Sequence, residues 1–258
     1  MENRLKKLLQ QGKIAIGAQL RFGSPAIAEL FGLAGFDYIV IDSEHAPQTP
    51  VGVQAQLQAI GCTKATGIVR ILKNDPDLMR PFLDMGAQGF LTPFVNSGEE
   101  AKLGVSAVRY PPAGSRGWGP ARASQYGYET QYYSKANDSI VYLPIIEDVK
   151  AIKNIDQILS VDGVDSFIIG PVDLSLSLGV PMDFTNPKFK DTIKVVIKAA
   201  QSLKKPMGTA IYGGDMFNTD TYKRFVDEGF TLLLIGGDEW MLNSSCLKVI
   251  DCISSVRG

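Results

Sequence analysis

The chain has 258 residues, of which 45% are hydrophobic and 21% charged, and its formal net charge is −1. This balance is typical of a globular protein with a substantial core. It argues against binding to nucleic acid or to a membrane surface, because both need clustered basic residues. The N-terminus lacks the apolar region of a signal peptide, and no apolar run approaches the roughly 20 residues of a membrane-spanning helix. Three cysteines without paired spacing favour a reducing, cytoplasmic location.

The only histidine, His45, lies in the stretch VIDSEHAP, after an apolar run and beside Asp42 and Glu44. A lone histidine is more often a hydrogen-bonded polar residue than a catalyst, so its role depends on what the fold brings near it. One histidine and three scattered cysteines also disfavour a tetrahedral zinc site. Any metal is therefore expected to have oxygen ligands, as Mg²⁺ and Mn²⁺ do.

Short apolar runs, continuous rather than alternating and rich in Ile, Val and Phe, recur along the chain. Strands that are covered on both faces have this character. The amphipathic N-terminus predicts a short helix, and Ser24 and Pro25 are suited to start another. We expect strands at 15–20, 38–42, 67–72, 89–95, 142–147, 166–171, 207–213 and 231–237. We expect helices between them that include 24–35, 75–86, 97–109 and 186–203.

Eight strand–helix units in about 250 residues match a (β/α)₈ barrel, which we expect to form a single domain over 1–258. The alternative is an open, doubly wound sheet, which typically has a glycine-rich dinucleotide fingerprint after its first strand; QLRFGSPAIAE does not provide one. Residues 110–141 break the rhythm and predict a long loop after the fourth helix. Loops of this length are usually functional or interfacial.

In such a barrel the active site lies at the carboxyl ends of the strands. Polar side chains collect there after the second, third, fifth and sixth expected strands: Asp42, Glu44, His45, Arg70, Lys73, Glu147 and Asp173. The carboxylates of Glu147 and Asp173 end neighbouring strands, so together they need a cation, or one must take a proton.

Arg70 interrupts an apolar strand, so a guanidinium inside the barrel must be paired or bind an anion. The alternative is a structural salt bridge at the barrel rim. Asp84 is either a residue of the outer helical layer or a hydrogen-bond partner that raises the basicity of His45.

Several linked motifs resemble the HpcH/HpaI aldolase family, whose members are metal-dependent pyruvate aldolases of class II that cleave 4-hydroxy-2-oxo acids. The motifs are GFDYIVIDSEHAP, VRILKND, LDMGAQGFLTPFV, RYPPAGSRG, IIEDVKAIKNIDQI and GVDSFIIGPVDLSLSLG. They occur in order from about residue 14 to the last strand. The resemblance therefore covers nearly the whole chain, and it includes the nearby 2-dehydro-3-deoxyglucarate aldolases.

The resemblance implies a role for each matching residue. His45 corresponds to the catalytic base, Asp84 to the acid that raises its basicity, and Arg70 to the arginine that stabilises the enolate. Glu147 and Asp173 correspond to the ligands of a divalent metal, Mg²⁺ or Mn²⁺ with Co²⁺ as a further candidate. The loop at Gly170, with the backbone of Val172 and Asp173, corresponds to the site of the substrate carboxylate. The expected reaction yields pyruvate and an aldehyde through a metal-bound enolate.

One position departs from the family pattern. Many members have a substrate-contacting Gln two residues before the metal-binding Glu, where this chain has Ile145. This difference favours, as an alternative function, a non-catalytic or altered-function ligand-binding barrel. Two further functions stay open: a citrate-lyase-β-like enzyme acting on acyl-CoA, and a Schiff-base aldolase that uses Lys73. Trp118 is a second candidate for a difference in substrate shape.

The C-terminal segment 238–258 contains more apolar residues than one helix face can bury on its own barrel. The family resemblance implies a hexamer built as a trimer of dimers, with the last helix packed against a neighbour. We therefore expect a homo-oligomer in which residues 110–141 lie near a neighbouring subunit and help to close its active site. The alternative is that both segments pack on their own subunit.

Overall fold

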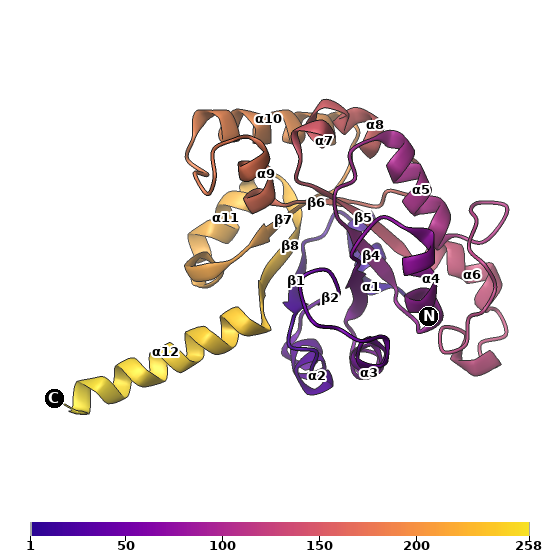
Figure 1. The fold of residues 1–258 in the computed structure, drawn as a ribbon, viewed down its shortest axis with the longest axis horizontal. Helices are drawn as coiled ribbons and strands as arrows, with labels where there is room; N and C mark the ends of the chain where they lie inside the picture. The colour runs from indigo at the N-terminus through magenta and orange to yellow at the C-terminus, as the bar shows by residue number, and fades with distance from the viewer. Residues whose placement is uncertain (1, 258) are drawn as a thin grey trace.

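The computed structural model describes residues 2–257 and contains a closed barrel of eight parallel strands surrounded by helices (Figure 1). Each strand pairs with the next, and β8 pairs with β1, so the predicted (β/α)₈ barrel is confirmed. The elements are α1 (Arg4–Gln10), β1 (Ala15–Leu20), α2 (Pro25–Ala34), β2 (Tyr38–Asp42), α3 (Pro50–Ile60), β3 (Thr66–Arg70), α4 (Pro76–Asp84), β4 (Gly89–Thr92), α5 (Gly98–Val108), η1 (Gln125–Gly127), α6 (Tyr132–Ser139), β5 (Val141–Ile146), α7 (Val149–Lys153), α8 (Ile155–Leu159), β6 (Phe167–Ile169), α9 (Pro171–Ser177), α10 (Pro187–Ser202), β7 (Met207–Ile211), η2 (Gly213–Phe217), α11 (Thr219–Asp227), β8 (Phe230–Gly237) and α12 (Asp238–Arg257).

The strands are buried on both faces, as their continuous apolar character predicts. One apolar cluster fills the interior of the barrel, and a larger one lies between the strands and the helices. The strand bounds agree with the sequence to within a few residues; β6 is shorter than expected because Pro171 already begins α9. Ser24 caps α2 and Pro25 occupies its first turn, as expected.

Helix α1 closes the amino-terminal end of the barrel. Leu5 and Leu9 belong to the interior cluster, and the amide of Leu5 donates to the Thr66 hydroxyl at 3.0 Å, at the start of β3. The Asn3 side chain donates to the carbonyls of Gln88 and Ser139, just before β4 and β5. With this end covered, the carboxyl ends of the strands are left for a ligand site.

The 110–141 excursion lies after α5, as expected, but it is not a structureless loop. It contains the short η1 and the helix α6, which the sequence pattern did not reveal. Tyr110, Ala123, Tyr132 and Ala136 form a small buried cluster of its own. The guanidinium of Arg116 is buried over the Tyr110 ring, 4.4 Å from its centroid. The excursion is therefore a packed substructure.

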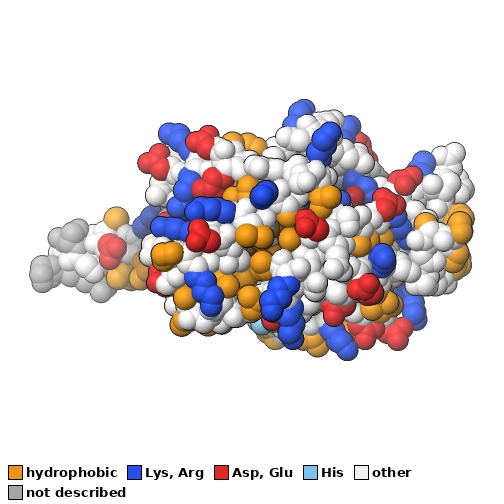
Figure 2. Space-filling model, turned by 90° about the horizontal axis from the view of Figure 1, so that it is seen from above, with side chains coloured by type: hydrophobic (Ala, Val, Ile, Leu, Met, Phe, Trp, Pro, Cys, Tyr) orange, Lys and Arg blue, Asp and Glu red, His pale blue; other side chains and the backbone are white. Residues whose placement is uncertain are grey.

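Helix α12 extends away from the barrel (Figure 1), and hydrophobic side chains are visible along it from another side (Figure 2). Its beginning contacts β8 and β1, but Leu247, Val249, Ile250 and Ile253 are exposed. None of the helices in the described chain combines the length and the apolar character needed to cross a bilayer. Leu247, Val249, Ile250 and Ile253 therefore leave an apolar surface of α12 exposed on the described subunit.

Candidate active site

The expected polar residues lie at or just after the carboxyl ends of β2, β3, β5 and β6. Asp42 ends β2 and Arg70 ends β3, and the two are paired in the register of these strands. Glu147 directly follows β5, and Asp173 lies in the first turn of α9, just after β6. The charges of Arg70, Glu44 and Asp173 all affect the pKa of Glu147, so these groups lie close enough to interact.

Asp42 holds Arg70 through two parallel hydrogen bonds. Arg70 Nε donates to Asp42 Oδ1 at 3.0 Å, and Nη2 donates to Oδ2 at 3.1 Å. Burial opposes ionisation of Asp42, but the charge and hydrogen bonds of Arg70, with two backbone amides, lower its pKa overall. Glu44 Oε2 also lies 3.1 Å from Arg70 Nε. The guanidinium is thus firmly paired, yet its edge that carries Nη1 is not used by Asp42.

Two further side chains, which the sequence did not reveal, support Asp42 from the first and seventh strands. Gln19 of β1 donates from Nε2 to Asp42 Oδ2 at 2.7 Å. The hydroxyl of Tyr212, which follows β7, donates to Gln19 Oε1 at 3.0 Å. The one signal in the sequence is a polar residue, Gln19, within a strand that is otherwise apolar, because a buried amide needs partners.

His45 lies on the turn after β2, and its side chain is 57% exposed. Its backbone amide donates to Asp42 Oδ1 at 3.1 Å, and its carbonyl accepts a hydrogen bond from Arg21 Nη2 at 3.1 Å. Its Nε2 lies 3.5 Å from Glu44 Oε2. The turn is held from both sides while the imidazole remains accessible, as a proton-transfer residue requires.

Arg21, also not evident from the sequence, follows β1 and connects this turn to α12. Its guanidinium donates to Glu239 Oε1 at 2.9 Å and lies 3.6 Å from Asp42 Oδ2. Burial raises the pKa of Glu239, while the hydrogen bond from Arg21 opposes that shift. The start of α12 is thereby joined to the histidine turn.

Glu147 is a buried carboxyl group with few compensating charges. Its Oε1 accepts a hydrogen bond from the Phe94 amide at 2.8 Å, where Phe94 has a left-handed φ of 50°. Burial raises its pKa to about 7, the charges of Asp173 and Glu44 add to this shift, and Phe94 and Arg70 oppose it. Burial and the neighbouring acids also raise the pKa of Glu44, against the opposing charge of Arg70. This part of the site therefore has more negative charge than its cations balance.

Gly170 lies against the free oxygen of Glu147. A Cβ on Gly170 would be 2.9 Å from Glu147 Oε2, closer than side chains pack, so glycine leaves room for the carboxylate. Gly170 precedes α9, and no side chain caps this helix. The amides of Val172 and Asp173 lie in its first turn, where backbone N–H groups have no partner within the helix. They can therefore bind an anion beside Glu147.

The acidic residues fit a divalent cation with oxygen ligands. Mg²⁺ is usually bound by one or two carboxylates, and substrate and water supply its other ligands. Glu147 and Asp173 provide two such groups, and a cation would relieve the charge that raises the pKa of Glu147. Among the described residues there is no cluster of three or more acidic, histidine or cysteine ligands. A divalent cation held by the two carboxylates alone would leave its other coordination positions to substrate and water.

Asp84 is not where a contact with His45 requires it. It ends α4, which leads to the amino end of β4, whereas His45 follows the carboxyl end of β2. Its Oδ1 accepts a hydrogen bond from Arg116 Nη2 at 3.2 Å, and its carbonyl accepts one from the Ala123 amide. Within one subunit Asp84 therefore belongs to the other end of the barrel, because a helix runs antiparallel to the strand before it.

Two further candidates from the sequence have clear positions. Ile145 is buried in the interior cluster, and its side chain lies beside Gly170, so it contributes an apolar wall where the family pattern has an amide. Lys73 is exposed in the turn after β3, a solvated position that does not favour Schiff-base chemistry.

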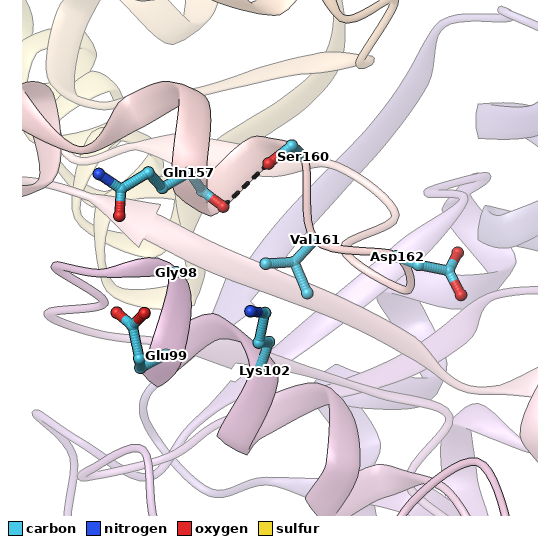
Figure 3. A pocket seen from close by; sticks show the side chains of 7 residues that line it. All are labelled: Gly98, Glu99, Lys102, Gln157, Ser160, Val161 and Asp162. Atoms are coloured by element: carbon cyan, nitrogen blue, oxygen red, sulfur yellow. Dashed lines mark hydrogen bonds between the residues drawn. The ribbon is translucent and has the colours of Figure 1, made fainter.

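Two hollows lie in the outer helical layer. One, of about 440 Å³, lies between α5 and α8 (Figure 3), where the Ser160 hydroxyl donates to the Gln157 carbonyl. The other, of about 820 Å³, lies between α10 and α11, with apolar walls that include Phe189, Ile193 and Phe225. Arg70, Glu147 and Asp173 line neither hollow, but the second hollow is also lined by Val172 and Tyr212 and therefore reaches the carboxyl ends of β6 and β7.

Charged side chains that collect at the carboxyl ends of a closed barrel of parallel strands are the arrangement typical of a barrel enzyme. The model of the HpcH/HpaI aldolase/citrate lyase family matches residues 20–244. The chain belongs to this family.

Relatives and solved structures agree with this assignment. A 4-hydroxy-2-oxo-heptane-1,7-dioate aldolase of Klebsiella pneumoniae is 40% identical over 244 residues, which are 94% of this chain and 90% of that protein. The HpcH/HpaI aldolase structure from Desulfitobacterium hafniense has a TM-score of 0.89 at 32% identity and covers 96% of each chain. A family protein from Burkholderia cenocepacia has a TM-score of 0.90 at 28% identity, over 99% of this chain and 100% of that chain. These relatives support an aldolase, a carbon–carbon lyase.

Proposed function

We propose that this chain is a divalent-metal-dependent pyruvate aldolase that cleaves 4-hydroxy-2-oxo acids to pyruvate and an aldehyde. The observation that carries the proposal is that two features occur at the same end of the barrel. One is the Arg70 guanidinium, which Asp42 holds in place, and the other is the acidic pair Glu147 and Asp173, whose charge the described residues do not balance. Relatives named as aldolases support the same reaction class.

Substrate binding uses the backbone of α9 and the free edge of Arg70. The amides of Val172 and Asp173 would bind the carboxylate of the 2-oxo acid, because N–H groups at the start of a helix attract anions. The guanidinium of Arg70 would face the 2-oxo group, where negative charge develops as the carbon–carbon bond breaks. A donor held in place before the reaction stabilises such charge without reorganising.

His45 would move the protons. It takes the proton of the 4-hydroxyl group, directly or through water, as the bond between C3 and C4 breaks to release the aldehyde. The electron pair of that bond becomes the enolate of pyruvate, which then takes a proton at C3. The exposed imidazole has access to both positions.

Glu147 and Asp173 would hold the divalent cation, Mg²⁺ or Mn²⁺, with Co²⁺ as a further candidate. When bound, the cation would supply Lewis-acid stabilisation of the charge that develops on the 2-oxo group. The fold supports this role because Gly170 keeps space open at the Glu147 carboxylate.

The proposal is tested by measuring exchange of the pyruvate methyl protons in D₂O and aldol formation with a panel of aldehydes. Each assay is run with Mn²⁺ or Mg²⁺ and with EDTA. We expect both activities, and we expect EDTA to abolish them. Full activity in EDTA would refute the metal dependence, and failure of both assays would favour the altered-function barrel indicated by Ile145.

We further propose that the protein is a cytoplasmic homo-oligomer, a hexamer arranged as a trimer of dimers. The support is the exposed apolar side of α12 and the exposed Trp118, Tyr126 and Tyr128 of the 110–141 excursion. Asp84 is bonded to that excursion through Arg116. If the excursion closes a neighbour's site, Asp84 would lie near the His45 of that neighbour.

Light scattering at micromolar concentration tests the assembly, with a chain truncated before α12 as the comparison. We expect a hexamer for the full chain and a smaller species after truncation. A monomeric mass for the full chain would refute the proposal.

A further inference from the structure

A chain of hydrogen bonds crosses the carboxyl end of the barrel from β7 to β3. It begins at the Tyr212 hydroxyl, passes through the Gln19 amide to Asp42, and ends at the Arg70 guanidinium. Tyr212, Gln19 and Asp42 come from the ends of three different strands, β7, β1 and β2. They meet because closure of the barrel places β1 between β8 and β2. Of these four residues, the aldolase mechanism proposed for this protein uses only Arg70.

Each member of the chain has a defined direction and charge. Gln19 is 3% exposed and Asp42 is 0% exposed, so water does not compete for their hydrogen bonds. Burial raises the pKa of Tyr212 to about 12, and its hydroxyl therefore remains a donor at working pH. This donor fixes the carbonyl oxygen of Gln19, so the amide nitrogen must point to Asp42.

Asp42 is saturated by this arrangement. Oδ2 accepts from Gln19 Nε2 and Arg70 Nη2, while Oδ1 accepts from Arg70 Nε and the amides of Glu44 and His45. The plane of the carboxylate is therefore set by its neighbours. Because Arg70 binds both oxygens in parallel, the plane of Asp42 sets the plane of the guanidinium and the direction of its Nη1 edge.

We propose that Tyr212 and Gln19 are positioning residues for Arg70, acting through Asp42. They determine which way the guanidinium presents its free edge to the charge that develops on the substrate. The inference rests on the proposed function, because it assigns these residues to the aldolase role of Arg70. Their contribution is to kcat rather than to substrate binding, since the stabilised charge arises in the transition state.

The test uses Tyr212→Phe, which removes one hydroxyl, and Gln19→Leu, which removes the whole link. We expect kcat for pyruvate proton exchange to fall about 5-fold in the first and about 10–100-fold in the second, with KM for pyruvate within about 2-fold of wild type. Because the two residues act in series, the double variant should lose no more than Gln19→Leu alone.

Matched controls separate this role from general loss of packing. Tyr222→Phe on α11 removes a tyrosine hydroxyl that donates to the Met216 carbonyl, and Gln56→Leu on α3 removes a buried glutamine that is bonded to Gln48. Neither pair belongs to the chain of hydrogen bonds that leads from Tyr212 to Arg70. We expect their kcat values to stay within about 2-fold of wild type at a similar loss of Tm.

A crystal structure of the Gln19→Leu variant gives a readout independent of turnover. We expect the Asp42 carboxylate and the Arg70 guanidinium to rotate together. Wild-type kcat in both variants, fully additive losses, or an effect on KM alone would overturn the positioning role. Inactivity of the wild-type protein would instead refute the proposed function, while the rotation would still report on the chain of hydrogen bonds.

Discussion

The two sides of the site differ in how their charges are balanced. On the β1–β3 side, Asp42 is fully buried, its pKa is lowered, and both of its oxygens accept from donors of this chain. On the β5–β6 side, Glu147 is also buried, but its pKa is raised and it accepts a hydrogen bond from the backbone amide of Phe94. Burial raises the pKa of both carboxyl groups, but the net shifts are opposite because a cation of this protein is paired with Asp42, whereas no cation among the described residues is paired with Glu147.

The difference indicates what each side does. On the arginine side, donors from the same subunit balance the charge of Asp42 and hold the Arg70 guanidinium in a fixed position. On the acidic side, the described residues do not balance the negative charge near Glu147, which is what the proposed metal site would require. Variants on the acidic side should therefore respond to metal, and variants on the arginine side should not. Four substitutions test this separation, from the largest expected effect to the smallest.

Glu147→Gln tests the acidic side most directly. The amide keeps the shape but loses the negative charge, so we expect metal-dependent exchange to fall by at least about 10³-fold. The Tm without metal should not decrease, because an unfavourable buried acid has been removed. Exchange rates and thermal melts with and without Mn²⁺ measure both effects, and Glu99→Gln on the exposed face of α5 is the control. Wild-type metal dependence in the variant would show that Glu147 is not a ligand.

Arg70→Lys tests the arginine side. Lysine keeps the charge but loses the planar fork that Asp42 holds, so we expect kcat to fall about 10²–10³-fold with an unchanged metal requirement. Steady-state exchange kinetics measure this effect and circular dichroism checks the fold. Arg80→Lys, at an exposed pair with Asp77, is the control. Near-wild-type exchange in the variant would mean that Arg70 only supports the barrel rim.

Gly170→Ala tests whether the Glu147 carboxylate needs its free space. The added Cβ would lie 2.9 Å from Oε2, so the carboxylate must shift. We expect the Mn²⁺ concentration for half-maximal activity to rise about 10-fold, as for other changes that reorient a ligand. Titration calorimetry with Mn²⁺ provides a second measurement. The control is Gly214→Ala, where a Cβ would meet nothing within 4 Å. Equal metal affinity in both variants would contradict the prediction.

Asp42→Asn tests how much the ionised Asp42 contributes to the free energy of unfolding as the pH changes. The folded-state pKa of Asp42 lies below its ordinary value of 3.8, so its stabilising effect is present above that value and is lost as pH falls through the folded pKa. We expect the variant to be less stable at pH 7 and to show a flatter decline of unfolding free energy below pH 3.8. Urea unfolding across this range measures the slope. A variant with the wild-type slope would show that Asp42 does not contribute to acid unfolding.

Much of the site could be located from the sequence because strand ends are recognisable without tertiary information. Glu147 directly follows one apolar strand and Asp173 lies shortly after the next, and parallel strands of a barrel bring such ends together. Gln19, Arg21 and Tyr212 could not be identified in this way, because a single polar residue near a strand end has no partner visible in the local sequence. Their partners are 23, 21 and 193 residues away along the chain.

The sequence by itself determined the barrel and the edge at which its chemistry lies, because burial on both faces and polar strand ends are local properties of each segment. The tertiary structure decided the rest. Closure of β8 onto β1 joins Tyr212, Gln19 and Asp42, and the antiparallel return of α4 takes Asp84 to the end opposite His45. The direction of α12 was also decided there, since an apolar helix needs a partner but does not itself determine whose surface supplies it.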